Sequence, residues 1–219
     1  MGQLQNKVAI VTGAGSGIGK ATALLFAKEG AKVTVSDINE DHGNEVVEFG
    51  ALHISVNNAG IGGEINKVGE MSVEGWDKVI ALNLSGVFYG MKYKITKKKK
   101  AGSGSVINIA SILGQAGFAT SAGYVASKHG FVWLTKSAAW EYGTENIRVN
   151  AIGPGFIYTG MVNEETMGKD AINFLESKHA FGRLGNPEEI AAMCLFLASD
   201  QASFVTGSYY PVDGGYLAV

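Results

Sequence analysis

The chain has little cysteine and proline, and its charges almost cancel. Cys194 is the single cysteine among 219 residues, which excludes an intramolecular disulfide. Only three prolines occur, and no proline- or serine-rich linker or internal repeat divides the chain, so a single domain over residues 1–219 is expected. The formal net charge of −2 gives no reason to expect nucleic acid or an anionic membrane as a partner.

Long apolar runs and metal-ligand spacings are also lacking. No apolar stretch is long enough to span a bilayer, and the polar segment Met1–Asn6 does not resemble a signal peptide, so a cytoplasmic location is expected. The four histidines lack the spacing of metal ligands, so no metal site is predicted. Cys194 shares an apolar helical stripe with Ile190 and Leu197, which predicts that it fills the core.

Glycine, by contrast, is abundant, and it is concentrated in the segment Thr12–Gly19, T-G-A-G-S-G-I-G. The apolar, β-branched run Lys7–Thr12 before it predicts a buried strand. An apolar helical face over Gly17–Gly30 and a second strand over Lys32–Ser36 follow. This is a strand-helix-strand unit with glycines at its corner, where a pyrophosphate can approach the backbone and the positive end of the helix.

Asp37 ends the second strand, where a carboxylate can accept hydrogen bonds from the ribose hydroxyls of an adenosine. The same carboxylate would repel a 2′-phosphate, which favours NAD over NADP. The alternative is that Asp37 caps a following helix.

Strands and helices alternate along the rest of the chain. This alternation predicts an α/β fold, a Rossmann-type doubly wound parallel sheet with helices on both faces. Further strands are expected at 54–57, 105–110, 148–152 and 209–212, and helices at 40–49, 72–100, 122–142 and 187–198.

Several motifs in this order resemble the short-chain dehydrogenase/reductase family. They are the glycine segment, Asn57-Asn58-Ala59-Gly60, Asn83-Leu84-Ser85-Gly86, Ser111, Tyr124 with Lys128, Pro154-Gly155 with Thr159, and Val212-Asp213-Gly214-Gly215. The resemblance extends over nearly the whole chain and implies an oxidoreductase that transfers a hydride between NAD(H) and a secondary alcohol or ketone. It implies cofactor contacts from Gly13, Gly15, Ser16, Gly17, Ile18, Gly19, Asp37, Ile38, Asn58, Ala59, Gly60, Tyr124, Lys128, Pro154, Gly155, Ile157 and Thr159.

Reduction of a ketone needs a proton donor, and Tyr124 is the candidate. A free tyrosine has a pKa of about 10, and Lys128, four residues on and on the same helical face, would lower it. Ser111 follows a buried strand and can hydrogen-bond the substrate oxygen. The resemblance implies that Asn83 is the fourth catalytic residue, which anchors a water next to the lysine.

Substrate contacts are expected from Ser111, Gln115, Phe118, Tyr124, Phe156 and Tyr158, and the polar, weakly periodic segment 158–181 is expected to be a lid. Two other functions remain open. One is a non-catalytic NAD-binding protein on the same fold. The other is an NADP-dependent 3-oxoacyl-carrier reductase, against which Asp37 argues.

The chain departs from the family between Asp37 and Asn57. The resemblance implies about thirty further residues there, including an outer strand and an acidic adenine contact. Either the connection is rebuilt or a segment between 40 and 56 is missing from this sequence. The right-handedness of parallel crossovers favours the missing segment. A lysine run, Lys97–Lys100, is expected to lie in water at a helix C-terminus.

Apolar residues beyond one core-facing stripe suggest self-association. They are Val87, Phe88 and Tyr89 in one long helix and Phe131, Val132, Trp133 and Leu134 in the other, together with the apolar segment 214–219. These surfaces match the two interfaces through which the family forms tetramers, so a homotetramer is expected.

Overall fold

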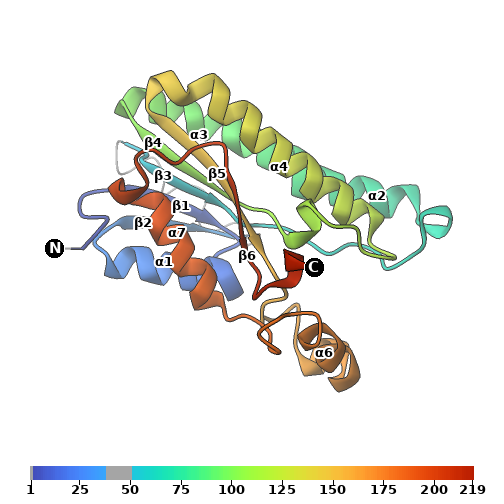
Figure 1. Ribbon diagram of the computed structural model, residues 1–219. Coiled ribbons are helices and arrows are strands. Elements are labelled where there is room, and N and C mark those ends of the chain that lie inside the picture. Colours follow the sequence, from blue (N-terminus) through green and yellow to red (C-terminus); the bar gives the residue numbers. More distant parts are fainter. Residues whose placement is uncertain (1, 38–50) are drawn as a thin grey trace.

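The computed structural model describes residues 2–37 and 51–219. The expected helix 40–49 and the expected contact of Ile38 lie outside the described residues. Figure 1 shows one sheet with helices packed on its two faces.

In the part of the chain that the structure describes, the sheet has six parallel strands in the order β2-β1-β3-β4-β5-β6. Their bounds are β1 Val8–Thr12, β2 Lys32–Ser36, β3 Ile54–Asn57, β4 Gly104–Ile109, β5 Ile147–Pro154 and β6 Tyr209–Val212. β3 pairs with β1 on the side away from β2, so the chain crosses over β1 between these strands. The predicted Rossmann-type fold is confirmed, and each strand from β1 to β5 points its carboxyl end toward one edge.

Among the described residues, five helices form the two layers. Helices α1 (Gly17–Lys28) and α7 (Pro187–Ala198) cover one face, and α2 (Val73–Ile80), α3 (Val87–Ala101) and α4 (Ala122–Tyr142) cover the other (Figure 1). The strands serve both layers because alternate residues point to opposite faces. On β5, Val149 and Ala151 pack in the cluster with α3 and α4, whereas Ile152 packs in the cluster with α1 and α7.

Two short helices, α5 (Glu164–Met167) and α6 (Lys169–Glu176), occupy the segment that was expected to be an irregular lid. Figure 1 shows α6 beyond the carboxyl edge of the sheet. Ile172 and Leu175 of α6 are buried against Leu184, so a small apolar core holds this segment. Single 3₁₀ turns lie at Val68–Glu70, Ile112–Gly114, Gly143–Glu145, Asp200–Ala202 and Tyr216–Ala218.

The helix expected over 72–100 is divided. A π-helical turn, Ala81–Gly86, joins α2 to α3 and carries Asn83 on its buried side. Such turns insert an extra residue into the hydrogen-bond ladder and are frequent at functional sites. The other expected boundaries hold well, and α4 and α7 match the expected ranges. Asn186, Pro187 and Glu189 form a capped start of α7.

The expectation that the lysine run lies in water is wrong for Lys98. Its side chain is fully buried, and its Nζ has no hydrogen-bond partner among the described residues. The reason is helical periodicity, because Lys98 follows Met91 and Ile95 on the stripe of α3 that faces the sheet. Lys97 and Lys100 are exposed, and Lys99 pairs with Glu145 at 2.9 Å.

Cys194 is buried in the core, as predicted, and burial raises the pKa of its thiol to about 12. Within residues 2–37 and 51–219, no helix is long and apolar enough to cross a membrane. In the same part of the chain, no three histidine, cysteine or acidic side chains gather as a metal site would require. The cytoplasmic location stays a prediction.

Candidate active site

The glycine turn after β1 is shaped by the absence of side chains. Gly13 and Gly17 have φ angles of +64° and +50°, in the left-handed region that favours glycine. A Cβ on Gly19 would overlap the carbonyl oxygen of Gly13, and one on Gly15 would lie 2.7 Å from Asp37 Oδ2. The turn therefore brings bare backbone to the N-terminus of α1, as a pyrophosphate site requires.

Asp37 lies against this turn. Its Oδ2 accepts a hydrogen bond from the Gly15 amide at 2.8 Å. At the N-terminus of α1, Ser16 makes no side-chain capping hydrogen bond. A carboxylate beside the glycine turn and a helix start without a side-chain cap fit the adenosine ribose and the phosphates of a nicotinamide dinucleotide. These residues therefore fit the cofactor that the sequence predicts.

The segment after β3 supports the turn from the other side. Asn58 Nδ2 donates to the carbonyl oxygens of Thr12 and Gly13 at 3.1 and 2.9 Å. Thr12 Oγ1 accepts from the amides of Asn58 and Ala59 at 3.1 and 3.3 Å. The side chain of Asn58, expected to contact the cofactor, thus braces the glycine turn.

Asn83 and Lys128 meet beside Gly60. A Cβ at Gly60 would lie 3.2 Å from Asn83 Oδ1 and 3.9 Å from Lys128 Nζ. Asn83 is buried, and its amide pairs with the backbone of Ile61, accepting at 2.9 Å and donating at 2.8 Å. The π-helical turn therefore ties the loop after β3 to the catalytic helix α4.

Ser111, Tyr124 and Lys128 come together at the carboxyl end of β4. Burial raises the pKa of Tyr124, and its hydrogen bond with Ser111 acts in the opposite direction. Lys128 Nζ lies 5.4 Å from the centre of the Tyr124 ring and donates to the Ile109 carbonyl at 2.9 Å. Burial lowers the pKa of Lys128 to about 8. A phenol with a hydroxyl and an amine close to it is an arrangement that can transfer a proton.

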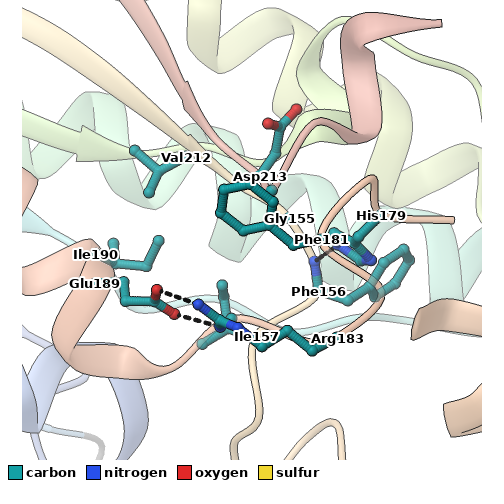
Figure 2. Close-up of a pocket in the computed structure, with 12 residues that line it drawn as sticks. Gly155, Phe156, Ile157, His179, Phe181, Arg183, Glu189, Ile190, Val212 and Asp213 are labelled. Atoms are coloured by element: carbon teal, nitrogen blue, oxygen red, sulfur yellow. Dashed lines mark hydrogen bonds and ion pairs between the residues drawn. The ribbon is translucent and has the colours of Figure 1, made fainter. Parts of the chain in front are cut away.

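The loop after β5 reaches both the glycine turn and a small cavity. Thr159 stands over the start of α1, because a Cβ on Gly17 would lie 3.1 Å from its Cγ2. Gly155 and Ile157 line a cavity of about 90 Å³ that Figure 2 shows beside the Arg183–Glu189 ion pair. Ser111, Tyr124 and Lys128 are not among its lining residues. Pro154 is the last residue of β5.

Two of the expected substrate residues lie together. The rings of Phe118 and Phe156 have centres 5.9 Å apart. Tyr216 joins them, with its ring centre 5.9 Å from that of Phe156. Two other candidates, Gln115 in the loop before Phe118 and Tyr158 just after Phe156, are exposed. Phe118, Phe156 and Tyr216 thus form an aromatic wall. Tyr216, from the C-terminal segment, was not predicted as part of this wall.

Two further residues near the site escaped the sequence analysis. His179 is buried, donates from Nδ1 to the Leu175 carbonyl at 2.8 Å and accepts from the Phe156 amide at Nε2, at 3.2 Å. Tyr209 of β6 donates its hydroxyl proton to the Ser111 carbonyl at 2.7 Å. Neither residue stands in a motif, so only the fold could reveal these contacts.

The fold and site together define a dinucleotide-binding α/β oxidoreductase with a serine-tyrosine-lysine centre. Family comparisons agree. The "short chain dehydrogenase" model matches residues 7–49, and the "Enoyl-(Acyl carrier protein) reductase" model matches residues 44–217. The chain belongs to the short-chain dehydrogenase/reductase family of NAD(P)-dependent enzymes.

Curated relatives cover nearly the whole chain. It is 45% identical to the cyclohexanol dehydrogenase of Acinetobacter sp. (strain SE19), over 98% of this chain and 96% of that protein. It is 40% identical to a 3-oxoacyl-(acyl-carrier-protein) reductase of Thermotoga maritima, over 97% and 98%. The alignment with the cyclohexanol dehydrogenase has 246 positions, so at least 27 (246 less 219) have no counterpart in this chain.

Solved structures give the same family. Levodione reductase superposes with a TM-score of 0.93 at 34% identity, over 99% of both chains. Carveol dehydrogenase from Mycobacterium avium, in complex with NAD, gives 0.94 at 27%, over 100% of both. A 2-deoxy-d-gluconate 3-dehydrogenase described as putative, from Agrobacterium tumefaciens and with bound NADP, gives 0.88 at 33%, over 99% and 98%. Both nicotinamide cofactors therefore occur among these neighbours.

Proposed function

We propose that this protein is an NAD-dependent dehydrogenase that interconverts cyclic secondary alcohols and their ketones, with Tyr124 as general acid and base. The observation that carries the proposal is the contact of Ser111, Tyr124 and Lys128 at the carboxyl edge of the sheet. This edge is where cofactors lie in open α/β folds.

Each residue has a distinct role in this proposal. A bound nicotinamide cofactor would supply the hydride acceptor for alcohol oxidation as NAD⁺ and the hydride donor for ketone reduction as NADH. Tyr124 takes the hydroxyl proton in oxidation and gives it back in reduction. Ser111 stabilises the negative charge that develops on the substrate oxygen. Lys128 lowers the pKa of Tyr124 when it is charged. Asn83 holds the loop after β3 against Lys128 and anchors a water there.

The substrate class rests on the aromatic wall and on the relatives. Phe118, Phe156 and Tyr216 form an apolar surface suited to an unsubstituted ring. The relatives named above include a cyclohexanol dehydrogenase and a levodione reductase. Arg183, just after the segment 158–181, is bound by Glu189 through two hydrogen bonds of 2.9 and 2.8 Å, so this guanidinium is not a ready partner for a highly anionic substrate.

The choice of NAD rests on Asp37. Its carboxylate lies at the glycine turn, where it can accept ribose hydroxyl protons and repel a 2′-phosphate. NADP is the less favoured cofactor.

The direct test compares Tyr124→Phe with the wild type on cyclohexanol and NAD. The variant should keep NAD affinity and thermal stability and lose turnover on the order of 10²- to 10⁴-fold, because only the proton relay is removed. Lys128→Ala should lose both turnover and NAD affinity. A Tyr124→Phe enzyme with a wild-type kcat would reject Tyr124 as the general acid and base.

A second candidate is an NADP-dependent 3-oxoacyl-carrier reductase, which the Thermotoga relative and the larger family model favour. Acetoacetyl-coenzyme A with NADPH is the discriminating substrate. Faster turnover with this pair than with cyclohexanol and NAD would support the reductase. A non-catalytic NAD-binding protein would turn over neither pair, and the retention of all four catalytic residue types argues against it.

A further inference from the structure

Tyr209 makes a contact that the catalytic scheme above does not use. Its hydroxyl donates to the backbone carbonyl of Ser111 at 2.7 Å, although the two residues are 98 positions apart. Tyr209 lies on β6, and Ser111 lies just beyond β4, so the phenol extends across β5. We propose that Tyr209 is the positioning residue of the catalytic serine, resting on the proposed role of Ser111.

Strand β5, which lies between Tyr209 and Ser111, has a glycine where the phenol passes. A Cβ at Gly153 of β5 would overlap the Tyr209 hydroxyl and the ring carbon that bears it. Gly153 is not among the glycines with positive φ, so its backbone conformation is open to any residue. The space that the phenol occupies is therefore the reason for glycine at this position, and Gly153 and Tyr209 form one structural unit.

The contact acts on the turn that presents Ser111. The Ser111 carbonyl also accepts from the Gly114 amide at 2.9 Å, and Ser111 Oγ accepts from the Leu113 amide at 3.2 Å. These bonds close the 3₁₀ turn Ile112–Gly114. The phenol thus fixes the Ser111 peptide from outside the turn, and a fixed peptide holds the hydroxyl in its orientation toward Tyr124.

Tyr209 is suited to donate at every working pH. Burial, followed by the negative charges of Asp213 and Tyr124, raises the pKa of Tyr209 far above its ordinary value. The phenol therefore keeps its proton while Tyr124 exchanges its own.

The strand supplies a matched control. Neighbouring residues on β6 point to opposite faces of the sheet. Tyr209 packs with the cluster of α3 and α4, whereas Tyr210 packs with the cluster of α1 and α7. Tyr210→Phe removes the same atom from the other face of the same strand.

The experiment compares Tyr209→Phe with Tyr210→Phe. We expect Tyr209→Phe to reduce kcat for cyclohexanol oxidation about 3- to 10-fold, the effect of one lost hydrogen bond, with unchanged NAD affinity. The ascending limb of the pH–rate profile should move to higher pH, because the Ser111 hydrogen bond that lowers the pKa of Tyr124 is weakened. Tyr210→Phe should leave both quantities unchanged.

Amide hydrogen exchange of the peptide 111–117, followed by mass spectrometry, measures the positioning without relying on catalysis. Exchange should accelerate in Tyr209→Phe and not in Tyr210→Phe. Unchanged exchange and an unchanged pH profile in Tyr209→Phe would overturn the inference. A wild type without alcohol oxidation would reject the proposed function instead, and the exchange experiment would then decide the role of Tyr209 by itself.

The Gly153→Ala variant is an independent test of the Tyr209–Ser111 contact. The added methyl group should displace the phenol, lower the melting temperature and reproduce the faster exchange of peptide 111–117. In Gly153→Ala/Tyr209→Ala the overlap is gone, so the melting temperature should rise above that of Gly153→Ala while exchange stays fast. A Gly153→Ala protein with wild-type stability and exchange would contradict the inference.

Discussion

At the scale of single residues, the two lysines on the inner side of α3 are the least expected feature. Lys94 Nζ donates to Asn57 Oδ1 at 2.7 Å, and burial lowers its pKa to about 8. Lys98 is fully buried and finds no hydrogen-bond partner within residues 2–37 and 51–219, and burial followed by the charge of Lys94 lowers its pKa well below the ordinary value. Burial disfavours the charged form of both amines, so both groups reduce the stability of the folded protein at pH values below the ordinary lysine pKa.

Replacement of Lys98 should therefore stabilise the protein. We expect Lys98→Met to raise the free energy of unfolding at pH 7 by about 1–3 kcal/mol, since an unsatisfied buried amine is replaced by an apolar side chain of similar length. Lys97→Met, on the exposed side of the helix, is the control and should change little. Urea denaturation of both variants measures the difference, and an unstable Lys98→Met protein would show that the amine has a partner.

The sign of the pH dependence follows from the lowered pKa values. The folded-state pKa lies below that of the unfolded chain, so wild-type stability should rise as pH increases from the folded value toward about 10.4, the ordinary lysine pKa. In Lys98→Met, the increase in the free energy of unfolding between pH 7 and 9.5 should be much smaller. The increase that remains comes from Lys94.

Asp37 allows a test of cofactor choice. Asp37→Ser combined with Ile38→Arg removes the carboxylate and adds a cation for the 2′-phosphate. NAD affinity should fall and NADP affinity should rise, each by about 10- to 100-fold, as expected for hydrogen bonds to charged groups. Asp200→Ser, at the opposite edge of the sheet, should alter neither. Tighter binding of NADP than of NAD by the wild type would contradict the role given to Asp37.

The motif residues could be predicted from the sequence because they recur at fixed spacings. Tyr124 and Lys128 share a helical face, and Ser111 follows a recognisable strand, so their meeting is implied by order alone. Tyr209 and His179 act through contacts between distant segments, which no local pattern encodes. Lys98 was assigned to solvent because the run of four lysines obscured its place on the Met91–Ile95 stripe.

At the scale of elements, the glycine turn combines conformation and close packing. Gly13 and Gly17 have positive φ angles, and Gly19 has no room for a Cβ beside the Gly13 carbonyl oxygen. Both requirements were foreseeable from the strand-turn-helix pattern. The π-helical turn at Ala81–Gly86 was not, because its apolar periodicity differs from that of an α-helix by a single residue. The helices α5 and α6 are too short for a periodic signal.

Gly19→Ala tests the packing requirement in the turn. The new Cβ would overlap the Gly13 carbonyl oxygen and lie 2.7 Å from Asn58 Nδ2, so the turn must shift. We expect a lower melting temperature and a loss of NAD affinity greater than about tenfold. Gly143→Ala is the matched control, because its φ is −59° and a Cβ there meets no atom within 4 Å. Equal NAD affinities in the two variants would contradict this account.

At the scale of the whole molecule, the connection from β2 to β3 is where this chain is expected to depart from its family. The strand order requires the chain to pass over β1 within residues 37–53, most of which lie outside the described residues. The two family models overlap at residues 44–49, within the same interval. The intact mass of the natural protein would decide between a rebuilt connection and a missing segment, which stays a prediction here.

Of the residues that suggested self-association, the structure buries some in the core and exposes others. Val87, Phe131 and Val132 are buried in the core, so they need no partner. Phe88 and Tyr89 of α3 and Trp133 of α4 are exposed, by 47, 57 and 64%, and Tyr93 and Trp140 extend these surfaces. Both helices cover the same face of the sheet (Figure 1), so their exposed aromatic side chains form one candidate interface.

We expect a homotetramer in solution. Repulsion between the lysine runs of neighbouring subunits would oppose it, but the structure leaves fewer free charges in Lys97–Lys100 than four lysines imply. Lys98 is buried with a strongly lowered pKa, and Lys99 pairs with Glu145, so fewer free charges would meet where helix ends approach. Light scattering at micromolar concentration should give four times the chain mass of 23.0 kDa. Trp133→Glu should reduce this mass, because it places a charge within the aromatic interface, whereas Leu24→Glu, on the exposed side of α1, should not. A wild-type monomer would reject the assembly, and a dimer would leave one of the two interfaces.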